Sequence, residues 1–106
     1  ALPACGGVGC VWLGPGSRRM DFRVDRYDAD RFFRADLEEN QDVIRAKVAA
    51  ELDEGDVLFF HARLLHAAGR NRTAQTKFAA VFTYHATDNR PLSGTRSASS
   101  PDLSVP

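Results

Sequence analysis

The stretch Gly55-Asp56-Val57-Leu58-Phe59-Phe60-His61-Ala62-Arg63-Leu64-Leu65-His66 governs how this chain is expected to fold. A Gly-Asp turn leads into a short apolar run rich in strand-forming residues, and a second turn then carries His66. Further along, Lys77 opens another apolar segment, residues 78–82. The pattern predicts a buried strand, a turn that presents a histidine, and a new strand that begins with a cation.

Residues 77–85 (KFAAVFTYH) have the alternation of a strand. Period two places Phe78, Ala80, Phe82 and Tyr84 on one face, and Lys77, Ala79, Val81, Thr83 and His85 on the other. Both faces are largely apolar, so we expect a strand that is covered on both sides.

Residues 43–52 (VIRAKVAAEL) fit two structures. Their length and alanines suit a helix, whereas the alternation of apolar and charged residues suits a strand. We expect a strand, because residues 53–56 would then form a hairpin turn into the strand at 57–61.

The remaining segments surround these strands. Residues 6–13 form a short apolar segment that ends at the Gly14-Pro15-Gly16-Ser17 turn. The charged region 18–40 is expected to be a long solvated loop that covers a binding site, with a short helix from Asp28 as its cap. Residues 90–106 are expected to be an extended, weakly ordered tail that follows a domain at residues 1–89.

Composition excludes several classes of protein. The chain has 106 residues and a formal net charge of zero, which predicts at most one domain and no general attraction to nucleic acid. No apolar run approaches the roughly 20 residues of a membrane helix, and the first residues lack the features of a signal peptide. We therefore expect no membrane partner and a cytoplasmic protein, with Cys5 and Cys10 as reduced thiols; a short disulfide or a metal role is the alternative.

Charge is unevenly distributed along the chain. Residues 18–56 hold 12 acidic and 8 basic side chains, and residues 57–106 hold 2 acidic and 6 basic ones. Either the two halves neutralise each other, or the second half forms a basic, anion-binding mouth, with Arg63, Arg70, Arg72 and Lys77.

His66 and Lys77 are the main candidates for chemistry. A histidine on a turn at the rim of a β-roll can face a cavity and hold a metal, although a lone histidine there is more often structural. A lysine in an apolar cavity is costly unless an anion neutralises it, so Lys77 is a candidate carboxylate receptor; otherwise it extends to solvent at the strand end. His61 is expected at the rim. His85 is expected to be structural, since eight residues of strand separate it by about 27 Å from Lys77.

The chain resembles the carboxy-terminal part of the phytanoyl-CoA dioxygenase family of Fe(II)/2-oxoglutarate-dependent oxygenases. The resemblance runs from Gly14-Pro15-Gly16-Ser17-Arg18-Arg19 through Gly55-Asp56-Val57-Leu58-Phe59-Phe60-His61 to Leu64-Leu65-His66-Ala67-Ala68-Gly69-Arg70-Asn71-Arg72-Thr73, and ends at Lys77 and Phe82-Thr83-Tyr84-His85. It implies an all-β fold, a double-stranded β-helix of the jelly-roll or cupin type. It also implies that His66 is the second histidine of the iron site and that Lys77 pairs with the distal carboxylate of 2-oxoglutarate. Thr83, on the same face as Lys77, is expected to line the cofactor pocket.

The chain departs from the family pattern at three points. It contains no His-x-Asp or His-x-Glu motif, which normally supplies the other two iron ligands. Arg18 replaces the usual histidine of the turn, and Lys77 replaces the commoner arginine, which changes a bidentate fork into a point charge.

Two functional hypotheses follow. In the first, the chain is part of a dioxygenase that hydroxylates a small or lipid-like molecule, and it is inactive alone because half of the iron site is missing. In the second, it is a metal-free, oligomeric β-roll that binds an anion near Lys77. The missing half predicts a piece of a longer enzyme, early residues that are absent here, or a short protein that dimerises to cover its open sheet edges.

Overall fold

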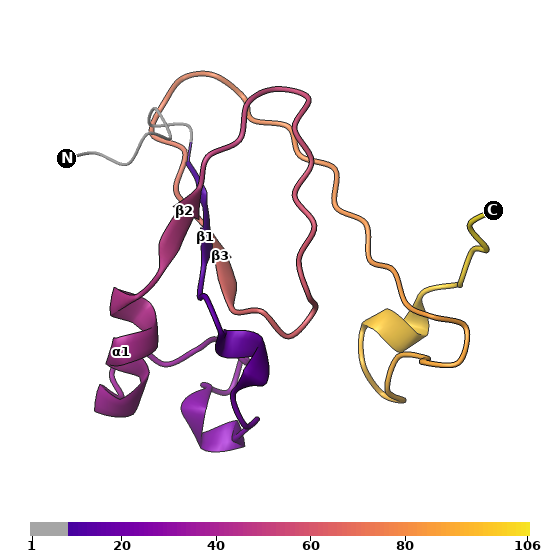
Figure 1. Ribbon diagram of the computed structural model, residues 1–106, viewed down its shortest axis with the longest axis horizontal. Helices are drawn as coiled ribbons and strands as arrows, with labels where there is room; N and C mark the ends of the chain where they lie inside the picture. Colours follow the sequence, from indigo (N-terminus) through magenta and orange to yellow (C-terminus); the bar gives the residue numbers. More distant parts are fainter. Residues whose placement is uncertain (1–8) are drawn as a thin grey trace.

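The computed structural model describes residues 9–106, and its centre is a three-stranded antiparallel sheet (Figure 1). Strand β1 (Val11–Leu13) lies between β2 (Val48–Ala50) and β3 (His66–Ala68). In this register Trp12 lies opposite both Ala49 and Ala67. The sheet thus joins three segments that are far apart in the sequence.

Glycines close both ends of the pairing between β1 and β3. At one end, Gly9 has a φ of 92°, and a Cβ there would lie 2.4 Å from the Gly69 carbonyl oxygen, so no other residue fits. At the other end, the Gly14 N–H donates to the Leu65 carbonyl at 2.8 Å, and the Leu65 N–H donates to Ser17 Oγ at 2.8 Å. The Gly-Pro-Gly-Ser turn is therefore fastened to the residues that precede His66.

The charged region forms a polar arm, which we define as residues 20–37, and a helix. A short 3-10 turn at Ser17–Arg19 precedes the arm, a second one at Val24–Arg26 lies within it, and an isolated bridge joins Tyr27 to Phe33. Helix α1 (Glu38–Arg45) follows directly, with two glutamates in its first turn and Arg45 in its last, as the helix dipole favours.

Two expectations for this region are corrected. Residues 43–52 are not one strand, because α1 continues to Arg45 and β2 begins at Val48. Nor does Asp28 cap a helix: its Oδ1 accepts hydrogen bonds from the N–H groups of Asp30 and Phe32, both at 2.9 Å. These bonds close a tight turn in which Arg31 takes a φ of 68°, a conformation outside any right-handed helix.

The two strands predicted at residues 57–61 and 77–85 are also wrong for this structure. The turn before the first is present, since the Asp56 N–H donates to the Asp53 carbonyl at 3.0 Å. Both segments, however, are extended chain with no ladder partner among residues 9–106, and Phe59 and Phe78 are 82% and 90% exposed. Because a strand forms only beside another strand, these sequences remain unpaired here.

The chain is expanded, with a radius of gyration of 15.9 Å. A compact domain of this length would have a radius of about 13 Å. Within residues 9–106, Cys10 is the one buried apolar residue. The carboxy-terminal part, with a 3-10 turn at Ser97–Ser99, lies apart from the sheet (Figure 1).

The structure bears on two further expectations, the redox state of the cysteines and the absence of a membrane span. Cys10 is disulfide-bonded, which corrects its assignment as a reduced thiol; Cys5 lies outside the described residues. The part of the chain that the structure describes holds no helix with the length and hydropathy of a membrane span.

Candidate functional site

The candidate site is a cavity of about 910 Å³ between the sheet, the polar arm and residues 62–67. Trp12 and Ala67 contribute from the sheet, while Val43 and Lys47 contribute from α1 and the residues after it. Its size and largely apolar, aromatic lining are typical of sites for small molecules.

Aromatic side chains of the polar arm form one wall. Phe22 stacks on Tyr27 with ring centroids 5.3 Å apart, and Phe33 meets Tyr27 edge-on at 5.6 Å. The bridge between Tyr27 and Phe33 brings these rings together, so the wall depends on the tight turn at Asp28. Such pairs add about 0.5–1.5 kcal/mol beyond the area that they bury.

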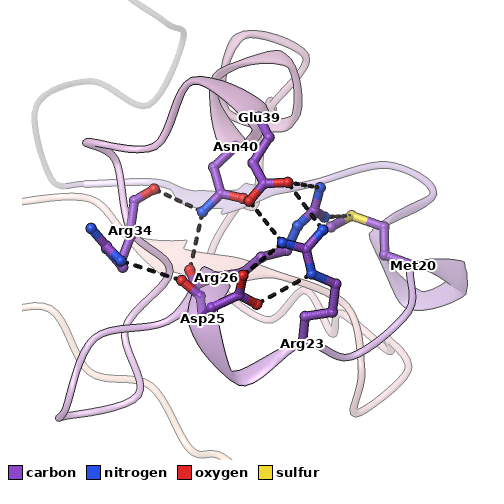
Figure 2. A network of polar contacts seen from close by, with 7 residues as sticks. All are labelled: Met20, Arg23, Asp25, Arg26, Arg34, Glu39 and Asn40. Carbon is purple, nitrogen blue, oxygen red and sulfur yellow. Dashed lines mark hydrogen bonds and ion pairs between the residues drawn. The ribbon is translucent and has the colours of Figure 1, made fainter.

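An ion network fixes the arm to α1 (Figure 2). Arg23 Nη2 lies 2.7 Å from an Asp25 carboxylate oxygen and 3.0 Å from Glu39 Oε1. Arg26 reaches the other Glu39 oxygen at 3.6 Å, and its Nη1 lies 3.9 Å from Met20 Sδ. Glu39 is thus shared by two arginines of the arm.

Asn40 is the buried centre of this region, with 0% of its surface exposed. Its Nδ2 donates to the carbonyl oxygens of Arg26 at 3.0 Å and Arg34 at 2.8 Å (Figure 2). One side chain on α1 therefore satisfies backbone groups at both ends of the arm's turn, and this contact holds the turn closed.

The pKa values of the arm follow these contacts. The hydrogen bond from Arg23 lowers the pKa of Asp25, and the hydrogen bonds to Asp25 and then Glu39 raise the pKa of Arg23. In the same way, the hydrogen bond between Arg34 and Asp36 lowers the pKa of Asp36 and raises that of Arg34. The network therefore stays charged across the neutral range.

His66 lies at the wall of the cavity, as the first residue of β3. Its Nδ1 is 2.9 Å from the Leu64 carbonyl oxygen, and its ring tilts against Phe60 with centroids 4.8 Å apart. If Nδ1 carries the proton for that contact, Nε2 is left with its lone pair, which is the form that binds a metal.

Lys77 lies elsewhere. Its Nζ donates to the Gly9 carbonyl at 2.7 Å. Gly9 precedes the first residue of β1, whereas His66 pairs with the last one. The register pairs His66 with Leu13, four residues from Gly9, so about 13 Å of strand separates the two ends. Thr83 is exposed on the extended segment. The structure does not bring His66, Lys77 and Thr83 together, and their assigned roles stay predictions.

The other two histidines have local partners. His61 Nδ1 accepts a hydrogen bond from the Arg63 N–H at 3.0 Å. His85 Nε2 lies 3.1 Å from Asp102 Oδ1, and this contact raises the pKa of His85. Arg90 lies 3.9 Å from the same carboxylate, so the cluster joins the tail to residue 85.

A complete iron site is not formed by the residues that the structure describes. Among residues 9–106, no group of three or more His, Cys, Asp or Glu side chains is placed to hold a metal ion. His66 alone does not match the two-histidine, one-carboxylate donor set that Fe(II) requires in non-haem oxygenases. The described residues therefore do not fit the metal by themselves.

Comparison with known proteins identifies the family. A family model described as phytanoyl-CoA dioxygenase (PhyH) matches residues 8–79. The chain belongs to the phytanoyl-CoA dioxygenase family. The matched range spans the sheet, the polar arm, His66 and Lys77, and it ends before Thr83. Searches of curated proteins and of solved structures gave no match.

Family membership confirms the resemblance drawn from the sequence motifs, and the structure adds residues that the motifs did not indicate. The main additions are Asn40 and the contact of Lys47 Nζ with the Trp12 ring, 4.9 Å from its centroid. Of the residues that build the site, Ser17 is the one that a sequence motif indicated, because it ends the Gly-Pro-Gly-Ser turn. Asn40 lies in a charged run and gives no sign that it is buried.

Proposed function

We propose that this chain forms part of a non-haem Fe(II)/2-oxoglutarate-dependent oxygenase that hydroxylates a small or lipid-like molecule. The observation that carries the proposal is the family match over residues 8–79, in which His66 lies at the wall of the cavity. In this family, Fe(II) and 2-oxoglutarate supply the oxidising chemistry. The cavity supports the proposal because it places room for a substrate beside the candidate ligand.

In this proposal the chain contributes His66 as one metal ligand, Lys77 as the partner of the distal carboxylate of 2-oxoglutarate, and Thr83 as part of the cofactor pocket. The remaining two ligands would be side chains outside a His-x-Asp or His-x-Glu motif, which this sequence lacks, or side chains of a second copy of the chain. Lys77 must then exchange the neutral Gly9 carbonyl for a carboxylate, which is the stronger partner for an ammonium group.

The full fold in this proposal is a double-stranded β-helix, completed by strands that pair with residues 57–61 and 77–85. The solvent-exposed apolar side chains of these segments support this fold, since further strands would cover them; Phe78 and Val81 are 90% and 84% exposed. A cytoplasmic location is part of the same proposal, although the disulfide at Cys10 argues against a strongly reducing compartment.

The same exposed segments favour the second candidate, a metal-free β-roll that oligomerises and binds an anion near Lys77. Here another copy of the chain would cover the unpaired edges. The two candidates differ in what they bind: the first requires a metal at His66, and the second requires none.

Anaerobic calorimetry separates them. Mn²⁺, a redox-silent substitute for Fe²⁺, is titrated into the chain with and without 2-oxoglutarate, and His66→Ala is compared with His61→Ala. The oxygenase proposal predicts binding that 2-oxoglutarate strengthens, that His66→Ala removes and that His61→Ala retains. If a folded sample binds no Mn²⁺, or if both variants bind it equally, the oxygenase proposal fails for this chain.

A further inference from the structure

Trp12, on the central strand of the sheet, has small residues opposite it on both neighbouring strands. On the central strand, Trp12 lies directly opposite Ala49 on one side and Ala67 on the other. Residues directly opposite each other in an antiparallel pair share a face, so the two residues directly across from the indole carry only methyl groups. Trp12 and Ala67 both line the cavity, and the indole is partly exposed there.

The polar arm places more aromatic rings around the same space. Phe22, Tyr27 and Phe33 all line the cavity, and their mutual contacts are stacked or edge-on. A cavity with an indole on the sheet and a cluster of phenyl rings on the arm favours a ligand that is itself flat and aromatic, because such a ring can stack on one wall and meet the other edge-on.

Charge at the cavity favours an anion. Its lining holds three cations, Arg31, Lys47 and Arg63, and two carboxylates, Asp21 and Asp28. Asp28 Oδ1 is already occupied by two backbone N–H groups, and Arg63 donates to the Met20 carbonyl at 3.0 Å.

Lys47 is the cation best placed to receive that anion. Its ammonium group lies 4.9 Å from the centroid of the Trp12 ring, and within residues 9–106 it forms no ion pair. An ammonium group on an indole face keeps its outer side free for a carboxylate.

We infer that the cavity binds a flat aromatic carboxylate, with its ring beside Trp12 and its carboxylate on Lys47. A volume of about 910 Å³ leaves room for such a molecule. As a statement about binding, this inference stands on the cavity alone. As a statement about the substrate class, it rests on the proposed oxygenase function.

Calorimetry on the 106-residue chain, without metal or 2-oxoglutarate, tests the inference. The probes are 2-naphthoate, the uncharged 2-naphthylmethanol, and decanoate, which has the charge but no ring. We expect 2-naphthoate to bind most tightly. Lys47→Met should weaken 2-naphthoate roughly threefold, the scale of one exposed charge pair, and leave 2-naphthylmethanol unchanged. Arg45→Met, which removes a cation two residues away that does not line the cavity, should change neither.

A second variant tests the position of the ring. Ala67→Leu fills the space beside Trp12, so it should abolish binding of 2-naphthoate while the circular dichroism spectrum of the chain is retained. Equal binding of decanoate, or no effect of Lys47→Met and Ala67→Leu, would overturn the inference. Because no metal is present, this result is independent of whether Mn²⁺ binds at His66.

Discussion

The polar arm and the two extended segments at residues 57–61 and 77–85 behave in opposite ways. The arm is strongly charged, yet it closes around a fully buried Asn40 and a shared ion network. The two segments are rich in large apolar side chains, yet Phe59 and Phe78 are 82% and 90% exposed. Hydropathy alone would have predicted the reverse.

The difference lies in where each region finds its partners. Turns and a short helix satisfy their backbone groups within a few residues, and two arginines of the arm reach the Glu39 carboxylate on the neighbouring helix. A strand must find its hydrogen-bond partners on another strand. In this chain, β1 already has a neighbour on each side, and nothing in residues 9–106 pairs with the two extended segments.

The largest expected effect is at Asn40. Asn40→Ala removes both hydrogen bonds to the carbonyls of Arg26 and Arg34 and should lower the free energy of unfolding by about 2 kcal/mol. Urea denaturation followed by the fluorescence of Trp12, the one tryptophan in the chain, measures it. Asp42→Ala, which loses an exposed pair with Arg45, is the control and should cost less than about 0.5 kcal/mol. Equal losses in the two variants would mean that Asn40 does not hold the arm.

Ser17 should come next. Ser17→Ala leaves the partly buried Leu65 N–H without the acceptor that it has at 2.8 Å, and should lower the free energy of unfolding by about 1 kcal/mol. Because this bond joins the turn to the residues before His66, any metal affinity at His66 should fall with it. Ser104→Ala, in the exposed tail, should change neither quantity. A stable Ser17→Ala variant with unchanged hydrogen exchange at Leu65 would show that the turn is held by other contacts.

A smaller effect is expected in the extended segments. Phe82, which is 73% exposed, should tolerate Phe82→Ser with a change below about 0.5 kcal/mol in dilute solution. Phe33→Ser, on the arm, should cost more because Phe33 packs against Tyr27. Sedimentation velocity over a range of concentrations adds the test of self-association, which Phe82→Ser should reduce if copies of the chain cover this segment. A large loss of stability in Phe82→Ser would show that the segment is packed after all.

The smallest effect concerns the tail and depends on pH. Asp102 raises the pKa of His85 above its ordinary value of 6.5, so the ion pair that joins the tail is fully formed below pH 6.5 and is lost as the pH rises through the raised pKa. Protection of the amides at residues 95–103, relative to their intrinsic exchange rates, should therefore be weaker at pH 8.5 than at pH 6. Asp102→Asn should remove this pH dependence; if exchange in the variant still depends on pH in the same way, after correction for intrinsic rates, His85 does not hold the tail.

The candidate site was predicted only in part. The motif from Gly14 to Ser17 and the stretch that ends in His66 identified the family, and the structure joins them through Ser17 and Leu65. The structure does not place Lys77 beside His66, because residues 77–85 pair with no strand among residues 9–106 and Lys77 Nζ bonds to the Gly9 carbonyl. The aromatic wall of the arm was not predicted, since it depends on a turn in which Asp28 bonds to backbone rather than capping a helix.

The sequence by itself determined the family, the turns at residues 14–17 and 53–56, and the absence of a His-x-Asp motif, because these depend on residue identity and short spacing. Only the tertiary structure decided that α1 ends at Arg45 and β2 begins at Val48, that Asn40 is buried, and that residues 57–61 and 77–85 stay unpaired. The physical reason is that helix, strand and burial in these segments depend on partners distant in the sequence, and a local pattern records what a segment can form rather than what lies beside it.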